Sequence, residues 1–206
     1  MVVDDAVLTA PEHCQVESWV QHSAGQLDRW AVPACNLGGQ WEIAAGVGQV
    51  SLDRPGPAYR LGLLQAKTVF HALERNGWGI GLTTAYQFRQ GEGRAGDVSV
   101  LVPVSVSLLD DKVLVHMNGG WTHARSTGHG DGFAAAGAEW ALQPVLSLTL
   151  EAYGTRRSHA FAQVGMSYTV IPDRLAFDAG IGRRIGHAGA ERYVTAGLTL
   201  TSPALR

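Results

Sequence analysis

Hydrophobic and polar residues alternate strictly along three consecutive stretches of the chain, residues 78–88, 98–108 and 113–122. In the middle stretch one face is entirely aliphatic and consists of Val98, Val100, Val102, Val104, Val106 and Leu108. A period of two over about ten residues predicts strands with one apolar face and one small or polar face. Strands of soluble sheets are roughly half as long. The pattern is therefore typical of transmembrane β-barrel strands.

The same alternation recurs along the chain and predicts twelve strands. They are expected at residues 15–22, 27–35, 40–51, 58–70, 77–88, 97–108, 113–124, 132–142, 145–154, 159–170, 174–184 and 191–201. An even number agrees with single-chain bacterial barrels, and short turns alternate with longer glycine-rich loops. This indicates an all-β, antiparallel up-and-down barrel with its turns and both termini on the periplasmic side. Residues 1–13 are interpreted as a periplasmic lead-in, and residues 14–206 as a single transmembrane barrel domain.

Composition supports a barrel and gives no sign of bound cofactors. Only 17% of the 206 residues are charged, the formal net charge is −2, and 26 residues are glycine, which suits a lumen lined by small residues. No run approaches 18 apolar residues, so no transmembrane helix is expected. Residues 2–5 lack the basic start and apolar core of a signal peptide, which indicates a mature chain with an added initiator methionine. Without a basic patch, a zinc spacing or a phosphate loop, we expect no nucleic acid, metal or cofactor.

Outward aromatic residues are expected to form two belts at the membrane interfaces. Those near periplasmic strand ends are Trp41, Phe70, Trp78, Trp140, Tyr168 and Phe177. Those near outer strand ends are Tyr59, Tyr86, Phe88 and Trp121. Core aromatics of a soluble protein would not be sorted by strand end, so the belts favour a membrane barrel.

Two positions interrupt the alternation. In the strand at 58–70 the apolar face changes side, and a bulge near Leu63 and Leu64 would restore it while turning Arg60, Gln65 and Lys67 inward. Pro103 lies in mid-strand and removes one donor from the hydrogen-bond ladder.

The two cysteines are expected to form a disulfide. Cys14 opens the first strand and Cys35 closes the second, so both lie at the same end of an antiparallel pair. The geometry permits a bridge and the periplasm is oxidising. We interpret the bridge as structural.

Both signs of charge occur on the faces expected to line the lumen. The candidate solute-binding groups are Glu17, Arg29, Lys67, His116, Asn118, Glu139, Glu151, Asp178 and Arg184. Such charges must be hydrated or paired. If a loop at 125–131 joins its two strands, Asn118 lies opposite Glu139 with His116 one step below, and Glu151 is diagonal to Glu139. These four residues predict a polar cluster, which is either a solute-binding constriction, a catalytic constellation or a plug that holds the barrel's shape.

Arginines gather at the expected outer loops and strand ends: Arg54, Arg89, Arg94, Arg125, Arg156, Arg157, Arg183 and Arg192. Arginine there suits bidentate contacts to phosphates of lipopolysaccharide and other outer-membrane lipid. Loop solubility explains the same distribution equally well.

Residues 14–201 as a whole resemble a Gram-negative outer-membrane β-barrel. The stretches Glu17-Ser-Trp19, Trp30-Ala-Val-Pro-Ala-Cys-Asn36 and Trp41-Glu-Ile43 resemble small barrels related to the phenol-degradation meta-pathway transporters. The resemblance implies a porin-like outer-membrane transport channel.

Three functions are therefore weighed. The first is a passive channel for a small hydrophilic or amphiphilic solute, without enzymatic activity. The second is a closed barrel that serves as a scaffold or docking protein for an envelope partner. The third is a lipid-modifying enzyme, for which His123, His129 and His159 with Ser126 or Ser158 are the candidate groups.

Overall fold

The structure, a computed structural model, describes residues 2–53, 58–91, 96–125, 127–157, 159–186 and 191–204. Its strands are β1 (His13–Ser23), β2 (Gln26–Asn36), β3 (Trp41–Leu52), β4 (Tyr59–His71), β5 (Trp78–Arg89), β6 (Gly96–Leu108), β7 (Val113–Ala124), β8 (His129–Gln143), β9 (Leu146–Thr155), β10 (Phe161–Ile171), β11 (Leu175–Arg184) and β12 (Arg192–Thr201). All twelve predicted strands are present, and their ends differ from prediction by no more than three residues.

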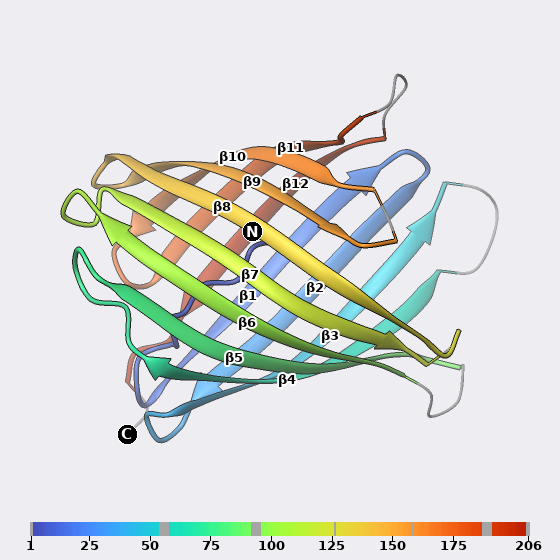
Figure 1. Ribbon diagram of the computed structural model, residues 1–206, viewed down its shortest axis with the longest axis horizontal. Coiled ribbons are helices and arrows are strands. Elements are labelled where there is room, and N and C mark those ends of the chain that lie inside the picture. The colour runs from blue at the N-terminus through green and yellow to red at the C-terminus, as the bar shows by residue number, and fades with distance from the viewer. Residues whose placement is uncertain are drawn as a thin grey trace.

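Every strand pairs with its sequence neighbours in antiparallel fashion, and β1 pairs with β12 to close the barrel (Figure 1). Closure leaves no unpaired strand edge. The connections at 37–40, 72–77, 109–112, 144–145 and 172–174 define one end of the barrel, here called the turn end. The remaining connections define the loop end. The C-terminus lies at the turn end, whereas the N-terminus lies inside the outline of the barrel (Figure 1).

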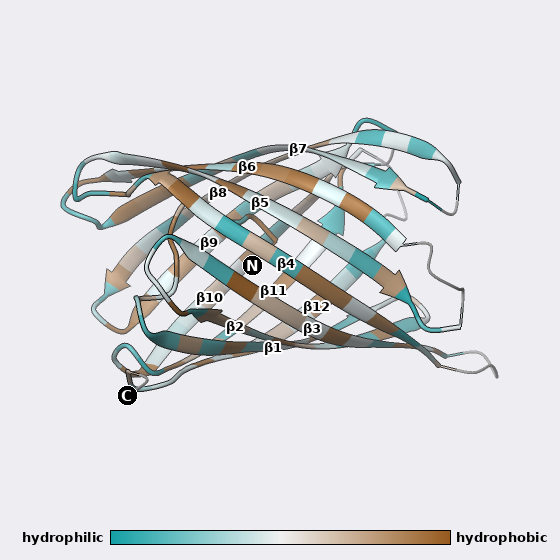
Figure 2. Cartoon of the chain, turned by 90° about the horizontal axis from the view of Figure 1, so that it is seen from below, coloured by the Kyte–Doolittle hydropathy of each residue, from teal (hydrophilic) through white to brown (hydrophobic). Residues whose placement is uncertain are grey.

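The two faces of the strands separate by polarity, as the alternation predicted. Val100 and Val102 are 38% and 39% exposed on the outside, whereas Ser105 on the opposite face of β6 is fully buried. Apolar residues alternate with small or polar ones along the strands in Figure 2. No helix in the described part of the chain is long and apolar enough to cross a membrane.

Most of the predicted outward aromatics face outward. The six near the turn end, Trp41, Phe70, Trp78, Trp140, Tyr168 and Phe177, are all between 48% and 69% exposed. The prediction for Tyr59 was wrong. Tyr59 pairs with inward-facing Val50, and the Arg89 guanidinium lies 3.9 Å from the centre of its ring. An inward cation–π contact at the barrel mouth thus takes the place of one belt residue.

The bulge expected near Leu63 and Leu64 is absent, because the β3–β4 and β4–β5 registers run through this point without a shift. The irregularity in β4 lies instead between Val69 and His71. Leu61 and Leu63 therefore face the lumen, and Arg60 faces outward. The β5–β6 pairing passes from Ile80–Val104 to Thr83–Leu101, so the ladder is interrupted beside Pro103, as its missing N–H predicted.

The predicted disulfide joins Cys14 to Cys35, which are direct cross-strand partners with Cα atoms 4.0 Å apart. The backbone N–H of Ser202 donates to the Cys14 carbonyl at 2.7 Å. The residue that follows β12 is thereby bonded to the bridged end of β1, at the seam where the barrel closes.

Candidate functional site: the lumen and its N-terminal segment

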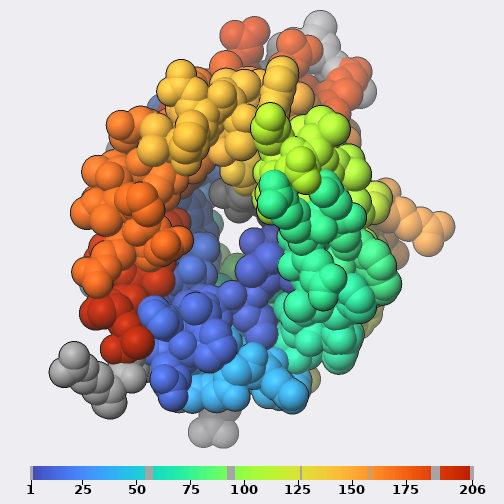
Figure 3. All heavy atoms as spheres, turned by 90° about the vertical axis from the view of Figure 1, so that its left-hand side faces the viewer, coloured from blue at the N-terminus to red at the C-terminus, as the bar shows by residue number. Residues whose placement is uncertain are grey.

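The stretch that precedes β1 runs into the barrel and occupies part of the lumen (Figures 1 and 3). Residues 2–9 are here called the N-terminal segment. The chain reverses at Pro11 and Glu12, where Glu12 adopts a left-handed φ of 61° and its N–H donates to the Asn36 carbonyl at 2.7 Å. The sequence indicated only a lead-in before the barrel. A location inside the lumen was not predicted.

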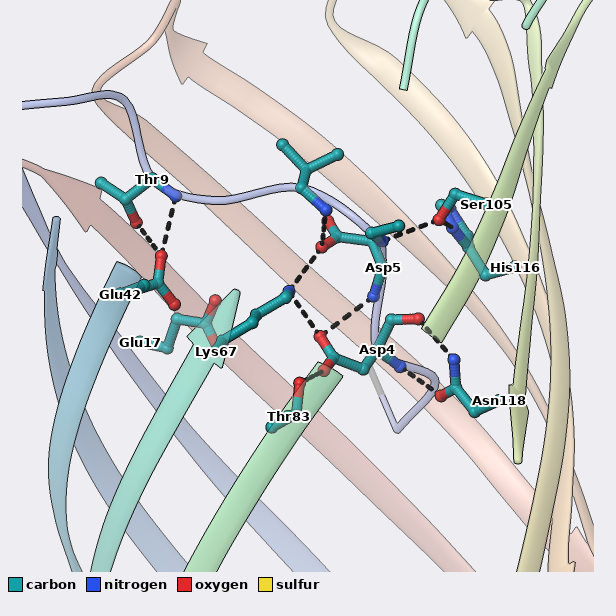
Figure 4. A network of polar contacts seen from close by, with 12 residues as sticks. Asp4, Asp5, Thr9, Glu17, Glu42, Lys67, Thr83, Ser105, His116 and Asn118 are labelled. Atoms are coloured by element: carbon teal, nitrogen blue, oxygen red, sulfur yellow. Dashed lines mark hydrogen bonds and ion pairs between the residues drawn. The ribbon is translucent and has the colours of Figure 1, made fainter. Parts of the chain in front are cut away.

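Strands β7 and β9 supply hydrogen-bond partners for the first residues of the segment, and Figure 4 shows the β7 partner, Asn118. The Glu151 carboxylate accepts the backbone N–H groups of Val2 and Val3 at 3.1 and 3.0 Å. The Asn118 side chain binds Asp4 at both backbone groups, accepting from its N–H at 2.7 Å and donating to its carbonyl at 2.8 Å. Because unbonded backbone groups are costly to bury, these side chains replace a strand neighbour for an otherwise isolated chain.

Further along the segment, Ala6 and Thr9 are held in the same way by β6 and β3. The Ala6 N–H donates to Ser105 Oγ at 2.8 Å, and Ser105 Oγ lies 2.7 Å from His116 Nδ1. The Glu42 carboxylate accepts from both the N–H and the hydroxyl of Thr9. The Asn36 amide at the end of β2 donates to the Thr9 carbonyl at 2.7 Å. Lumen-facing groups on five strands, β2, β3, β6, β7 and β9, therefore bind backbone groups between Val2 and Thr9.

Charge pairing anchors the middle of the segment. The Lys67 ammonium on β4 lies 2.8 Å from a carboxylate oxygen of Asp4 and 2.8 Å from one of Asp5. Thr83 on β5 donates to the second oxygen of Asp4 at 2.8 Å. The Lys67 side chain is only 6% exposed. Because the two carboxylates are 26% and 48% exposed, removing one of them costs less than the roughly 3–5 kcal/mol found for fully buried pairs.

One glycine on the barrel wall accommodates the segment. Gly137 on β8 lies between its register partners His116 and Glu151. A Cβ atom built at Gly137 would lie 3.3 and 3.4 Å from side-chain atoms of Val3. A larger side chain at this position would therefore meet the segment.

A cavity of about 730 Å³ remains in the lumen beside the segment. The opening seen from the turn end is narrowed by the segment, and a space is left next to it (Figure 3). Six carboxylates line the cavity, together with one lysine: Asp4, Asp5, Glu17, Glu42, Glu139, Asp178 and Lys67. Since Lys67 is already paired with two aspartates, negative charge dominates the field along this path.

The structure brings together three residues of the predicted polar cluster. His116, Asn118 and Glu151 are 4–5% exposed and contact the segment directly or through Ser105. The predicted register of Glu139 was wrong. Glu139 pairs with Leu114, and Asn118 pairs with Ala135, because β8 begins at His129 and leaves a shorter loop than the sequence indicated. Glu139 is diagonal to Glu151, as predicted, and lines the cavity.

The other predicted lumen residues fall into two groups. Glu17 and Asp178 line the cavity, and the inward face of β11 also carries Arg184, whose Nε is buried and has no hydrogen-bond partner among the described residues. Arg29 was placed wrongly. It pairs with Val20 and Gln49 on the outer face, because Trp30, Val32 and Ala34 form the inward face of β2.

Two groups of lumen-facing aromatic residues were not singled out from the sequence. Trp19 and Trp30 stack with ring centres 5.8 Å apart and pack against Val32, Ala34 and Ala44. Near the loop end the Tyr153 and Tyr193 hydroxyls lie 2.6 Å apart, and Tyr193 also donates to Gln163. The strand alternation places Trp19, Tyr153 and Tyr193 on inward faces, but it does not predict their contacts with Trp30 and Gln163.

Two of the histidines considered for lipid chemistry, His123 and His129, have contacts that do not belong to a catalytic set. His123 faces outward and stacks on Trp121, and His129 Nδ1 bonds to the Thr127 carbonyl. Ser126 and Ser158 lie outside the described residues, as do Arg54 and Arg94. Within the described ranges, no three or more His, Cys, Asp or Glu side chains are grouped so that they could hold a metal ion.

These features define a closed twelve-stranded antiparallel barrel of the outer-membrane type, with a polar lumen and an apolar exterior. Residues 1–202 match the family described as "Uncharacterised conserved protein UCP029691", and the chain belongs to that family. Comparison with the curated proteins gives no match.

Several solved structures share the fold. The KdgM porin superposes with a TM-score of 0.73 at 7% identity, over 90% of this chain and 98% of that one. The COG4313 outer membrane channel from Pseudomonas putida F1 has a TM-score of 0.70 at 10% identity, over 95% and 97% of the two chains. The outer membrane phospholipase A from Escherichia coli is less similar, with a TM-score of 0.54 at 10% identity over 92% and 90%. At such identities the likeness concerns the fold alone.

Proposed function

We propose that the protein is a passive channel of the bacterial outer membrane for small hydrophilic or amphiphilic solutes. The observation that carries the proposal is the charged cavity of about 730 Å³ inside a closed barrel with an apolar exterior. A polar lumen inside a barrel of this kind is the arrangement found in porins. Its size lies in the range of small-molecule sites. Similarity to a porin and to an outer membrane channel supports this function over chemistry on lipid.

The charges of the lumen favour cationic or neutral solutes. Carboxylates outnumber lysine six to one along the cavity, and rings of Asp and Glu select cations in other channels. The channel is oriented with its turn end in the periplasm, so that the C-terminus lies there and the N-terminal segment enters the lumen from that side (Figure 1). Kinship with the phenol-degradation transporters is part of the proposal, since an amphiphilic aromatic solute would suit the Trp19–Trp30 wall.

The N-terminal segment is a plug in this proposal. Its contacts consist of hydrogen bonds and ion pairs with groups that water or a solute could also satisfy. The barrel itself is closed by β1 and β12 without the segment. The segment can therefore leave the lumen without opening the wall.

Single-channel recording in planar bilayers tests the function directly. The full chain is expected to show small or intermittent currents, and a variant lacking residues 2–9 is expected to show steady currents several times larger. Heat-modifiable migration on gels and far-UV circular dichroism verify that both chains are folded barrels. If both folded chains are silent in the bilayer, the channel is wrong and a closed scaffold barrel is the better interpretation.

A further inference from the structure

Four polar residues lie side by side on the outer surface of β2 to β5, where the barrel faces lipid. Arg29 pairs with Gln49 across β2 and β3, and Gln49 pairs with Arg60 across β3 and β4. The N–H of Gln90, the residue after β5, donates to the Arg60 carbonyl at 2.9 Å. Direct cross-strand partners share a face, so all four side chains point outward. These residues are here called the outer polar row, and all four are exposed.

The row lies close to the loop end. Arg29 is three residues from the start of β2, Gln49 is three from the end of β3, and Arg60 is the second residue of β4. Charge on the lipid face of a barrel is costly at the bilayer midplane and nearly free at the interface. Two arginines are therefore tolerated at this height only if they meet headgroups instead of acyl chains.

The row is confined to one sector of the barrel. On β1 the residue that pairs with Arg29 is Val20, which is 43% exposed, and Val20 pairs in turn with Ala196 on β12. At the same height the exterior is thus apolar on one side of Arg29 and rich in hydrogen-bond donors on the other. Such a local change of polarity is not needed for solubility, because this face is in contact with the membrane.

The donors of the row have no acceptors within the described ranges. The side chains of Arg29 and Arg60 take part in no hydrogen bond or ion pair with a described residue. The row itself contains no carboxylate. Since neighbouring strands lie about 4.8 Å apart, the Cα atoms of the two arginines are separated by roughly 10 Å, with an amide between them. Two planar, fixed-charge forks at this spacing suit anionic oxygens.

We propose that the outer polar row binds the phosphate groups of the glycolipid that forms the outer leaflet, with Arg29 and Arg60 as the cationic contacts and Gln49 between them. The assignment to this leaflet rests on the proposed orientation, in which the loop end faces outward. Phosphate on a glycolipid headgroup combines the required charge with the required height. The arginines of the row differ from those at the loops in that they are fixed by strand register.

Lipid binding by the purified full chain tests the proposal. Native mass spectrometry in detergent would compare bisphosphorylated lipid A, dephosphorylated lipid A and phosphatidylglycerol. The unaltered chain is expected to prefer bisphosphorylated lipid A, and R29Q/R60Q is expected to weaken that binding about tenfold or more. The matched control is K112Q/R174Q, which removes two positive charges at the turn end and should bind as tightly as the unaltered chain.

Three results would overturn the proposal: unchanged lipid A binding by R29Q/R60Q, equal binding of dephosphorylated lipid A, or an equal loss of phosphatidylglycerol, which would indicate a general anion site. The single variants R29Q and R60Q, each expected to give a partial loss, serve if the double variant does not fold. Conductance is measured separately and should be unaffected, so failure of this site and failure of the channel are distinguishable.

Discussion

The lumen has two walls that carry similar polar side chains, which the N-terminal segment covers on one wall and leaves facing the cavity on the other. On β3 to β9, the segment wall, Glu42, Lys67, His116, Asn118 and Glu151 are 4–5% exposed and contact the N-terminal segment directly or, for His116, through Ser105. On β11 to β1, the open wall, Glu17 and Asp178 face the cavity, and Glu17 is exposed. Residue type alone therefore does not decide whether a lumen charge serves structure or transport. What decides its role is whether the N-terminal segment covers it or leaves it exposed to the cavity.

The largest effect on conductance is expected from a peptide that re-occupies the segment wall after residues 2–9 have been deleted. A free peptide with the sequence of residues 2–9 should block the barrel that lacks those residues, because the segment wall then offers its bonding groups to the peptide. Addition from the turn-end side at millimolar concentration should return conductance toward the full-length value. A peptide with both aspartates replaced by asparagine should block much more weakly, since the Lys67 pairs are lost. Equal block by both peptides would contradict the contribution of Lys67.

A substitution on the segment wall should open the channel without a deletion. Gly137→Leu places a side chain where Val3 lies, so the segment should be displaced and conductance should rise toward that of the deleted chain. The control is Gly119→Leu on β7, whose added Cβ would meet nothing within 4 Å. Unchanged conductance in folded Gly137→Leu would show that the segment shifts aside instead of leaving.

The open wall is expected to govern ion preference. In a KCl gradient, the double variant E17Q/D178N should shift the reversal potential toward lower cation selectivity. The shift should be larger at about 0.1 M than at about 1 M salt, because the Debye length falls from roughly 10 to roughly 3 Å. Glu42→Gln on the segment wall should change it less, since Glu42 is already bonded to Thr9. The reverse ranking would contradict the distinction between the walls.

The smallest effect on conductance is expected from the disulfide. Replacing Cys14 and Cys35 with serine should leave current and selectivity nearly unchanged, because the bridge lies at the turn end on the outer face of β1 and β2. Resistance to unfolding should fall by about 3 kcal/mol at most, given a sequence separation of 21 residues. Urea titration followed by tryptophan fluorescence measures the change. A large loss of conductance in the folded variant would contradict this expectation.

The barrel could be predicted from the sequence because its information is local. Alternation over ten residues gave all twelve strands, and the positions of Cys14 and Cys35 at strand ends gave the bridge. The errors arose where the strand register decides which way a residue faces or which residue it pairs with. Arg29 was placed inward on its charge, although its neighbour Trp30 faces inward and fixes the opposite face for Arg29. Glu139 was displaced by a misjudged loop length.

The N-terminal segment could not have been found in this way. Residues 2–9 have no period, and the hydrogen bonds and ion pairs that hold them to the barrel involve residues at least 27 positions away, such as Glu42, Lys67 or Glu151. Only the assembled lumen shows that Asp4 and Asp5 meet a lysine.

The reversal at Glu12 tethers the N-terminal segment to the disulfide-bonded hairpin of β1 and β2. A displaced segment therefore remains within a few residues' length of its site, at an effective concentration on the order of millimolar. Any solute that binds Lys67 or Asn118 therefore competes with a segment that stays covalently attached close to its site. The fraction of time for which the passage is free then depends on the solute's concentration divided by its dissociation constant, compared with the same ratio for the tethered segment.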